Sequence, residues 1–472
     1  MSLDHHVPLG LPTTLGALRD SGWQSRSVAA ELRHNAAARI AARQPLVEGV
    51  VGYEETVLPQ LERALLAGHD VIFLGERGQA KTRIIRSLVE LLDEWMPVVE
   101  GSEINDDPYH PVSRAARQLL AECGDATPIS WVHRSARFGE KLATPDTTIA
   151  DLIGEVDPIK VAEGRYLADE LTIHYGLVPR TNRGIFALNE LPDLSERIQV
   201  GLLNILEERD VQIRGYKVHL PLDVMLVASA NPEDYTNRGR IITPLKDRFG
   251  SQIRTHYPVD VETEMAVIEQ EADRPDVGVE VIVPEFMARI VAQLSHLARQ
   301  SPNISQRSGV SVRLSVANRE VLEAAAVRRS LRLGEPVAVP RISDLASLVA
   351  STAGKVELEA LDDSDERSIV ERLLKAATLL VFRETVGLEK ALPVLEAFNT
   401  GRVAHVGDDL PAAEQAQLAR TQAPLALAID GLGGTSDAEI ASAVEFVLEG
   451  LHLSKRLNKD SSGHKSLYRT RS

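Results

Sequence analysis

The stretch DVIFLGERGQAKTRIIRSLVELLDEWM, residues 70–96, decides the fold of this chain. After Asp70, residues 71–74 are β-branched or apolar and predict a short buried strand. Residues 75–82, GERGQAKT, follow at once, and beyond them apolar side chains recur every three to four positions as in an amphipathic helix. We expect this helix to end before Pro97. The order of strand, glycine-containing loop and helix is typical of a phosphate-binding α/β unit.

The loop GERGQAKT matches the spacing G-x-x-x-x-G-K-T at every fixed position but one, where Ala80 replaces the second glycine and keeps the side chain small. Such a loop wraps consecutive backbone N–H groups around a phosphate. Lys81 would reach the terminal phosphates, and the Thr82 hydroxyl would bind Mg²⁺. The sequence therefore predicts a nucleotide site made by Gly75, Glu76, Arg77, Gly78, Gln79, Ala80, Lys81 and Thr82.

Polar residues end two further apolar runs. Residues 184–195, GIFALNELPDLS, carry Asn189 and Glu190 at the end of an expected strand, and residues 224–235, VMLVASANPEDY, carry Asn231 in the same place. Glu190 can act as the general base that polarises an attacking water. Asn231 is neutral and suited to orienting water beside a γ-phosphate. A strand that ends in an acidic residue is common, so these residues gain weight only together with the loop.

Short apolar runs at 129–132, 185–188, 224–230 and 253–257 alternate with helix-like segments. This alternation predicts a doubly wound parallel sheet in an α/β fold. Residues 211–221, VQIRGYKVHLP, alternate apolar and polar side chains on both sides of a glycine and predict a β-hairpin. Residues 97–128, rich in Pro and Asp, are expected to form a surface insertion.

Composition limits the classes of partner and location. The 472 residues carry a net charge of -16, which disfavours nucleic acid as a general partner. The single cysteine, Cys123, allows no intramolecular disulfide. The N-terminus lacks a signal pattern, and no apolar run approaches the ~18 to 20 residues that span a bilayer. We expect a cytoplasmic protein that does not enter membranes.

The chain is expected to contain five regions. Residues 1–45 form an N-terminal helical extension with a helix over 27–43, and residues 46–258 form the α/β core. Residues 259–355 form an α-helical lid. A charged, linker-like stretch at 361–368 lies within a further helical region, 356–454. Residues 455–472 are basic and poor in apolar side chains, and we expect them to be disordered.

These motifs together resemble the AAA+ ATPases, in particular the magnesium-chelatase subunit I and MoxR group. The resemblance covers roughly residues 45–355 and follows the family's order of motifs. They are VEGVVGYEE (47–55), the phosphate loop, LNE as Walker B, SANPEDY as sensor 1, PLKDRFG (244–250) and SVRLSVANRE (311–320) as sensor 2. The segment that begins at Thr147 and runs into Walker B resembles the helix 2 insertion of that group. The hairpin at 211–221 resembles its pre-sensor 1 hairpin.

The resemblance assigns further roles. It implies ATP and Mg²⁺ as cofactors, with Gly52 and Tyr53 near the adenine. Arg248 would be the arginine finger that reaches the ATP of a neighbouring subunit, and Arg313 would be the sensor 2 arginine. A finger supplied in trans makes hydrolysis depend on a homo-oligomeric ring, by resemblance a hexamer.

The neighbouring arginines Arg238 and Arg240 are rivals for the role of Arg248. Walker B departs from the family, which usually has Asp-Glu where this chain has Asn189-Glu190. Asn189 can accept a hydrogen bond from a magnesium-bound water but adds no negative charge. We therefore expect a slow but genuine ATPase.

Four functions fit the sequence. The first is an ATP-hydrolysing ring motor that remodels a separate client, which could carry a von Willebrand A-type domain. The second is a MoxR-type chaperone ATPase. The third is a DNA-binding AAA+ transcription activator, which residues 436–459 would serve as a helix-turn-helix, although residues 135–180 hold no GAFTGA-like loop. The fourth is a scaffold that binds ATP and barely hydrolyses it.

Overall fold

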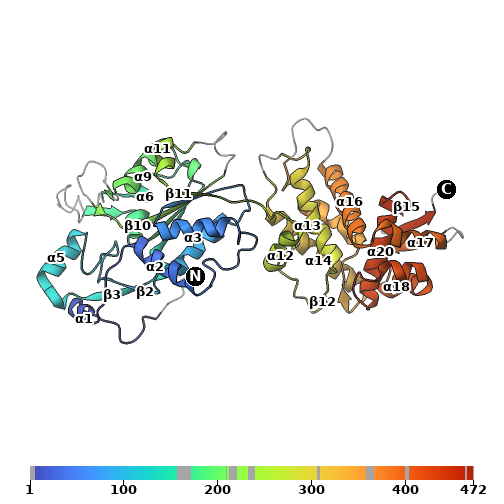
Figure 1. Cartoon of the computed structure of the whole chain (residues 1–472), viewed down its shortest axis with the longest axis horizontal. Coiled ribbons are helices and arrows are strands. Elements are labelled where there is room, and N and C mark those ends of the chain that lie inside the picture. Colours follow the sequence, from blue (N-terminus) through green and yellow to red (C-terminus); the bar gives the residue numbers. More distant parts are fainter. Residues whose placement is uncertain are drawn as a thin grey trace. The chain divides into compact units, whose positions relative to one another are not determined.

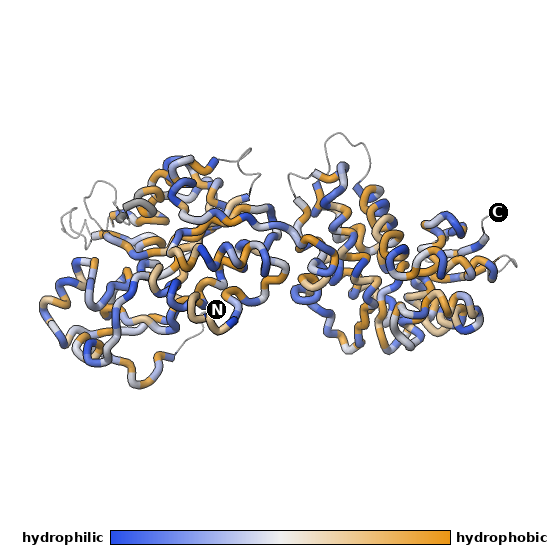
Figure 2. Tube along the Cα trace, viewed as in Figure 1, coloured by the Kyte–Doolittle hydropathy of each residue, from blue (hydrophilic) through white to orange (hydrophobic). Residues whose placement is uncertain are grey.

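The structure is a computed structural model, and it describes residues 6–156, 172–208, 210–211, 220–231, 240–305, 309–357, 366–398, 403–462 and 465–470. The chain divides into two compact units, Met1–His256 and Tyr257–Ser472 (Figure 1). Hydrophobic and hydrophilic residues are mixed along the trace of both units (Figure 2), as expected when each element buries one face. No helix in the described ranges is both long enough and apolar enough to span a bilayer.

A five-stranded parallel sheet forms the centre of the N-terminal unit. Its strand order is β11-β1-β10-β7-β4, and every neighbouring pair is parallel. The strands are β1 (Val71–Leu74), β4 (Phe138–Leu142), β7 (Gly184–Asn189), β10 (Val224–Ala230) and β11 (Ser251–Arg254). The crossover order confirms the predicted doubly wound α/β fold.

Helices cover both faces of this sheet (Figure 1). On one face lie α9 (Glu196–Glu208) and α11 (Thr243–Arg248), and on the other lie α2 (Val28–Ala41), α3 (Val57–Ala67) and α4 (Lys81–Ser87). Successive residues of β1 pack into opposite cores, since Ile72 joins the cluster of α9 and α11 whereas Phe73 joins that of the other three helices. Both faces of the strand are buried, which explains its uninterrupted apolar sequence.

The predicted helix over 82–96 is wrong in its second half. Helix α4 ends at Ser87, a 3₁₀ turn η1 covers Leu88–Leu91, and Trp95–Val99 form strand β2. Strand β2 pairs antiparallel with β3 (Ile129–His133), and the Trp95 ring packs edge-on against His133 with centroids 5.2 Å apart. This strand pairing outweighs the helical periodicity of the segment.

The predicted place of residues 129–132 in the parallel sheet is also wrong. They form β3, which pairs with β2 outside the central sheet, and the insertion between the two contains helix α5 (Arg114–Cys123). The strand next to β7 at one edge of the central sheet is instead β4, with the polar sequence FGEKL. An edge strand tolerates polar side chains, so its hydrophobicity gave no signal.

The predicted hairpin at 211–221 and the predicted helix 2 insertion are each described only in part. Asp210–Val211 (β8) pairs antiparallel with Leu220–Pro221 (β9), as the predicted hairpin requires, and residues 212–219 lie outside the described ranges. In the helix 2 insertion, Gly154–Val156 (β5) pairs antiparallel with Ile173–Tyr175 (β6), between helices α6 (Ile149–Leu152) and α8 (Leu177–Arg180). Residues 157–171 are outside the description.

A buried ion pair connects helix α2 to the core. The two guanidinium Nη atoms of Arg137 donate to the two carboxylate oxygens of Glu31 at 2.7 and 2.6 Å. Both residues are buried. Because a buried charge is costly without its partner, this bidentate pair makes α2 an integral part of the unit.

The C-terminal unit is largely helical. Its helices are α12 (Val261–Glu271), α13 (Glu285–Gln300), α14 (Val312–Leu333), α15 (Leu348–Thr352), α16 (Glu366–Thr385), α17 (Leu388–Phe398), α18 (Ala412–Thr421), α19 (Ala423–Ile429) and α20 (Asp437–Leu453), with a 3₁₀ turn η6 (Ile342–Ser347). Two short strands, β12 (Glu280–Val281) and β13 (Val337–Ala338), pair in parallel. These helices begin with α12 at Val261, in agreement with the predicted change to helical structure near residue 259.

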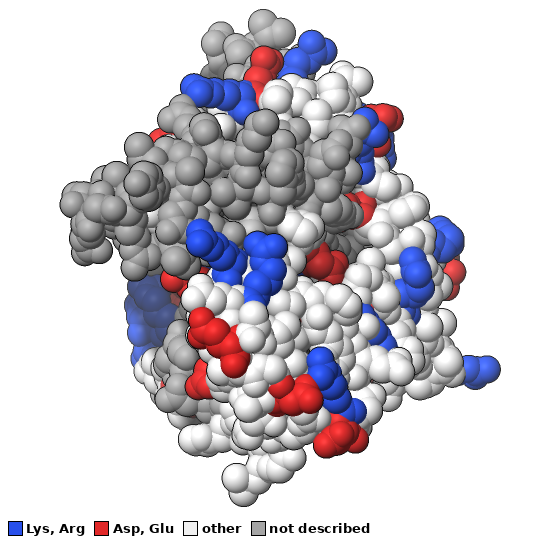
Figure 3. Space-filling model, turned by 90° about the vertical axis from the view of Figure 1, so that its left-hand side faces the viewer, with Lys and Arg blue, Asp and Glu red and all other residues white. Residues whose placement is uncertain are grey.

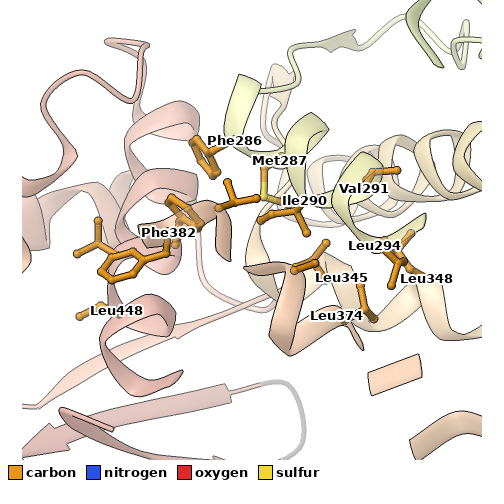
Figure 4. Packing of buried hydrophobic residues seen from close by; sticks show 14 of the residues in the cluster. Phe286, Met287, Ile290, Val291, Leu294, Leu345, Leu348, Leu374, Phe382 and Leu448 are labelled. Atoms are coloured by element: carbon orange, nitrogen blue, oxygen red, sulfur yellow. The ribbon is translucent and has the colours of Figure 1, made fainter. Parts of the chain in front are cut away.

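The predicted lid and the predicted C-terminal region share one hydrophobic core (Figure 4). Phe286 of α13 stacks on Phe446 of α20 with ring centroids 4.4 Å apart, and Phe382 of α16 meets the same ring edge-on. Polar contacts reinforce the connection, because Nη1 of Arg341 donates to the carbonyl oxygen of Leu410 at 2.9 Å. The backbone N–H of Ser343 donates to the buried carboxylate of Glu445 in α20 at 2.9 Å.

The predicted disordered tail is wrong over most of its length. Leu457–Ser462 (β15) pairs antiparallel with Lys465–Thr470 (β16), and β16 also pairs with Ala404–Gly407 (β14). Tyr468 is 1% exposed, and its hydroxyl donates to Glu449 of α20. The basic composition concealed a strand in which one aromatic side chain reaches the core.

We expect Tyr468→Ala to lower the free energy of unfolding of the C-terminal unit by about 3 kcal/mol, because it leaves a cavity and removes a partner of Glu449. Urea denaturation followed by circular dichroism measures the loss, and tryptophan fluorescence separates the other unit, which contains Trp23, Trp95 and Trp131. Lys465→Ala, at an exposed position of the same strand, is the control. Equal midpoints for the two variants would contradict an ordered β16.

Candidate functional site

The loop 75–82 joins the end of β1 to the start of α4, as predicted. Gly78 and Ala80 adopt left-handed backbone conformations, with φ of 74° and 54°. Ala80 therefore occupies a conformation that glycine adopts freely, at a cost of about 1 kcal/mol for a residue with a Cβ. Within the loop Gly75 and Gln79 are buried and Arg77 is exposed. The structure thus explains the glycine of the usual motif at position 80 and permits alanine with modest strain.

The ammonium group of Lys81 lies inside this loop. The residue is 7% exposed, and its Nζ donates to the carbonyl oxygens of Gly75 and Glu76, the latter at 2.7 Å. It also donates to Oδ1 of Asn231 at 2.7 Å. These acceptors are neutral oxygens around a buried positive charge at the N-terminus of α4. The set suits an anion such as phosphate, whose oxygens can replace the carbonyls as acceptors.

The predicted strand-end residues meet the same lysine. Asn231 follows β10, and its Nδ2 donates to Oε2 of Glu190 at 2.6 Å. Glu190 follows β7 with a left-handed backbone, φ 55°. Lys81, Asn231 and Glu190 therefore form one hydrogen-bonded chain across α4, β10 and the end of β7. Parallel strands bring their carboxyl ends to one edge of the sheet, where ligands bind in such folds.

Asn189 is buried at the end of β7, and its amide is held from both sides. Its Oδ1 accepts from the Ser229 hydroxyl at 3.1 Å, and its Nδ2 donates to Oε1 of Glu140 at 2.6 Å. Glu140 also accepts two hydrogen bonds from Arg86, at 2.8 and 3.1 Å, and these raise the pKa of the Arg86 guanidinium. Glu140 could not be found from the sequence, because the strand that carries it was not predicted.

Thr82 is the second residue of α4 and is half-buried. Arg86 follows one helical turn later, so the two side chains lie on the same face of the helix. The four-residue spacing from Thr82 is the sequence signal that could have indicated Arg86 as a neighbour of the site. Thr82 is the one hydroxyl in the loop, and Mg²⁺ would take it together with phosphate oxygens.

Side chains on both sides brace the loop. The Tyr53 hydroxyl donates to the carbonyls of Gln79 at 3.0 Å and His256 at 2.7 Å, and burial raises its pKa to about 12. From the end of β11, the Thr255 hydroxyl donates to Oε1 of Gln79 at 2.7 Å. Gly52 precedes Tyr53 with φ 85°. The structure thus gives Tyr53 a bracing contact with the loop itself, whereas Thr255 went unnoticed in the sequence.

The predicted arginines occupy different parts of the chain. Arg248 is the last residue of α11 and is exposed, and Arg240 is also exposed. Arg238 lies outside the described residues. Arg313 is the second residue of α14, is exposed, and belongs to the C-terminal unit. Their predicted roles stay predictions.

On the face drawn in Figure 3, acidic and basic side chains of the described residues are interspersed.

Comparisons with known proteins agree with this picture. The family model described as the sigma-54 interaction domain matches residues 163–248. The 38 kDa subunit of magnesium chelatase from Cereibacter sphaeroides is 29% identical over 232 residues, which cover 46% of this chain and 61% of that protein. Magnesium-chelatase subunit ChlI-2 from Arabidopsis thaliana is 29% identical over 216 residues, or 43% of this chain and 46% of that protein. The chain thus spans about half the length of these curated relatives.

Solved structures give weak overall superpositions. A chain of the BchI–BchD complex of magnesium chelatase aligns with 20% identity and a TM-score of 0.35, over 70% of this chain and 98% of that chain. NtrX from Brucella abortus aligns with 15% identity and a TM-score of 0.39, over 74% and 67%.

The parallel sheet, the loop around Lys81 and the polar strand ends form an α/β nucleotide-binding fold, and part of the chain resembles the AAA+ proteins. Within that class the chain resembles magnesium-chelatase subunit I.

A methyl group at Gly75 would collide with the bracing residues, since an added Cβ would lie 1.9 Å from Oγ1 of Thr255 and 2.2 Å from Oε1 of Gln79. We expect Gly75→Ala to destabilise the N-terminal unit by about 1 to 3 kcal/mol, measured by urea denaturation with tryptophan fluorescence. Gly201→Ala in α9 is the control, because its Cβ meets nothing closer than 3.9 Å and alanine favours a helix. A stability loss no larger than the control's would refute the close approach.

Proposed function

We propose that the chain binds ATP with Mg²⁺ in the loop 75–82, hydrolyses it, and acts in the cytoplasm as the motor of a ring that remodels a partner protein complex. The observation that carries this proposal is the chain of hydrogen bonds from Lys81 through Asn231 to Glu190. It connects the residue expected to bind phosphate with the residue expected to activate water. A lysine with a purely structural role would not need a glycine-containing loop and a carboxylate at the neighbouring strand end beside it.

Each residue of the site has a definite task in this proposal. The backbone N–H groups of the loop and the Lys81 ammonium bind the phosphates at the N-terminus of α4. Thr82 would bind Mg²⁺ with Asn189 close by, and the bound ion would neutralise the phosphate charge. When phosphate oxygens take over the Lys81 ammonium, Oδ1 of Asn231 becomes available to orient a water. Glu190, held by Nδ2 of Asn231, accepts the proton of that water.

Ring assembly follows from the proposed role of Arg248. Its side chain is exposed at the end of α11, as a residue that completes a neighbour's site would be. We propose a homo-oligomeric ring, by resemblance a hexamer, in which Arg313 serves as sensor 2 and Gly52 and Tyr53 lie near the adenine. The relatives are named as subunits of magnesium chelatase, which supports work on a partner. A client with a von Willebrand A-type domain is the form of partner that the resemblance suggests.

The alternatives differ in how the structure bears on them. A MoxR-type chaperone would use the same site and differ only in its client. The match to the sigma-54 interaction domain covers Walker B and sensor 1 and favours a transcription activator. However, residues 437–453, within the proposed helix-turn-helix, form the single helix α20, and most of its side chains are buried. A helix that is buried over most of its surface cannot enter a DNA groove, so the motor remains the better proposal.

Nucleotide binding is tested by replacing the buried ammonium. We expect Lys81→Ala to weaken binding of a fluorescent ATP analogue by at least tenfold, because no other side chain of the loop places a point charge on the β- and γ-phosphates. The exposed Lys375→Ala in α16 is the matched control. A Lys81→Ala affinity within about threefold of the control would show that the loop is not the phosphate site.

The trans role of Arg248 is tested in mixed rings. Arg248→Ala subunits keep their own binding loop, and Lys81→Ala subunits keep their arginine, so each lacks what the other supplies. We expect neither variant to hydrolyse ATP alone and activity to reappear on mixing, measured as phosphate release at fixed total protein. Mixtures as inactive as the separate variants would exclude Arg248 as the finger. The same mixing with Arg240→Ala examines its rival.

A further inference from the structure

We propose that Glu140 supplies to the bound magnesium the carboxylate charge that Asn189 lacks at the end of β7. This inference rests on the proposed function, because it takes Mg²⁺–ATP as the ligand of the loop 75–82. It assigns to a residue of the neighbouring strand the electrostatic task that an acidic residue would otherwise perform at position 189.

The sheet register brings the two side chains to one place. Leu142 of β4 lies opposite Asn189 of β7, and Glu140 lies opposite Ala187 two residues earlier. Residues two apart in a strand share a face, so Glu140 and Asn189 lie on the same face as Ala187. Ala187 packs in the cluster that contains Ile84 and Ile85 of α4. Glu140 and Asn189 therefore lie on the face of the sheet that is covered by the helix carrying Thr82.

The hydrogen bonds place the carboxylate of Glu140 directly beside the side chain of Asn189. Asn189 turns its amide nitrogen toward Oε1 of Glu140 at 2.6 Å and its oxygen toward Ser229 at 3.1 Å. The carboxylate that an acidic residue 189 would carry is thus replaced by a carboxylate one hydrogen bond away. The contact also explains why asparagine stands at position 189, since an aspartate there would put two like charges in contact with one another.

Arg86 fixes Glu140 beside α4. Its Nε and Nη2 hold the two carboxylate oxygens of Glu140 at 2.8 and 3.1 Å, and Arg86 lies one helical turn beyond Thr82. The Arg86 side chain is 63% exposed, whereas that of Glu140 is 23% exposed. Water therefore screens the guanidinium more than the carboxylate, and the negative charge dominates toward the interior.

Removing Glu140 and removing its partner Arg86 are expected to have different effects on magnesium binding. If Glu140 acts on the metal, removing its charge weakens magnesium binding, whereas removing the Arg86 charge does not. If the pair acts only by holding β4 against α4, either removal breaks the same bridge and has the same effect. Glu140→Gln and Arg86→Gln keep the size of the side chain or shorten it modestly and separate these two cases.

The experiment titrates Mg²⁺ into full-length protein with a fluorescent ATP analogue and records the Mg²⁺ concentration for half-maximal binding. We expect Glu140→Gln to raise this concentration about tenfold or more, the effect of one unit charge ~6 Å from a divalent ion at the dielectric constant of water. Arg86→Gln should leave it unchanged or lower it. Affinity measured in excess EDTA should be the same for wild type and both variants.

The double variant Asn189→Asp/Glu140→Gln returns the charge to the strand end, and the amide that it introduces at position 140 can donate to the new carboxylate. We expect it to restore the magnesium requirement of wild type to within about twofold. Mn²⁺ electron paramagnetic resonance in the presence of ATP provides a second, activity-independent measure of the metal affinity.

Two results would overturn the inference. One is an equal rise for Glu140→Gln and Arg86→Gln, which marks a structural bridge, and the other is no rise for Glu140→Gln. Failure of the proposed function is distinguishable from both, because wild type would then bind the analogue no better than Lys81→Ala at any Mg²⁺ concentration.

Discussion

The site depends on one buried cation. The ammonium of Lys81 lies within the loop that follows β1, where carbonyls of the loop and the Asn231 side chain surround it. A buried charge must be compensated, and here neutral oxygens and the ends of the parallel strands do so. This requirement fixes the loop against β10, and Tyr53 and Thr255 hold its other side. Hydrogen bonds thus connect the loop conformation and the placement of Glu190 to this one ammonium group.

Part of the negative charge near the site comes from a strand other than the one that ends in Asn189. The strand that the resemblance marks as Walker B ends in Asn189 and Glu190, and the only charge it contributes is on Glu190. The neighbouring strand β4 brings Glu140 to Asn189, and Arg86 of α4 orients it. The carboxylate that is missing at position 189 of β7 is thus supplied by Glu140 of β4. The fold therefore allows the same electrostatic task to be carried out from different strands.

The sequence predicted what depends on local order. The loop, β1, the strand ends at Asn189 and Asn231, and the helical unit beyond His256 were all correctly expected, because glycine spacing and apolar runs are local signals. Pairing across the chain was not predictable in this way. Trp95 joined a strand rather than a helix, β4 was polar because it lies at an edge, and Tyr468 anchored a tail that composition marked as disordered. Each error arose where a distant partner, rather than neighbouring residues, determined the structure.

The most direct test of the Lys81-centred site is amide hydrogen exchange of the full chain with and without Mg²⁺–ATP. The account predicts slowed exchange in peptides covering residues 75–88, and at the ends of β7 and β10, because phosphate binds the loop amides and Lys81 while Asn231 and Glu190 reorganise beside it. Lys81→Ala should abolish this protection. Unchanged exchange in the loop, or protection that persists in Lys81→Ala, would contradict the account.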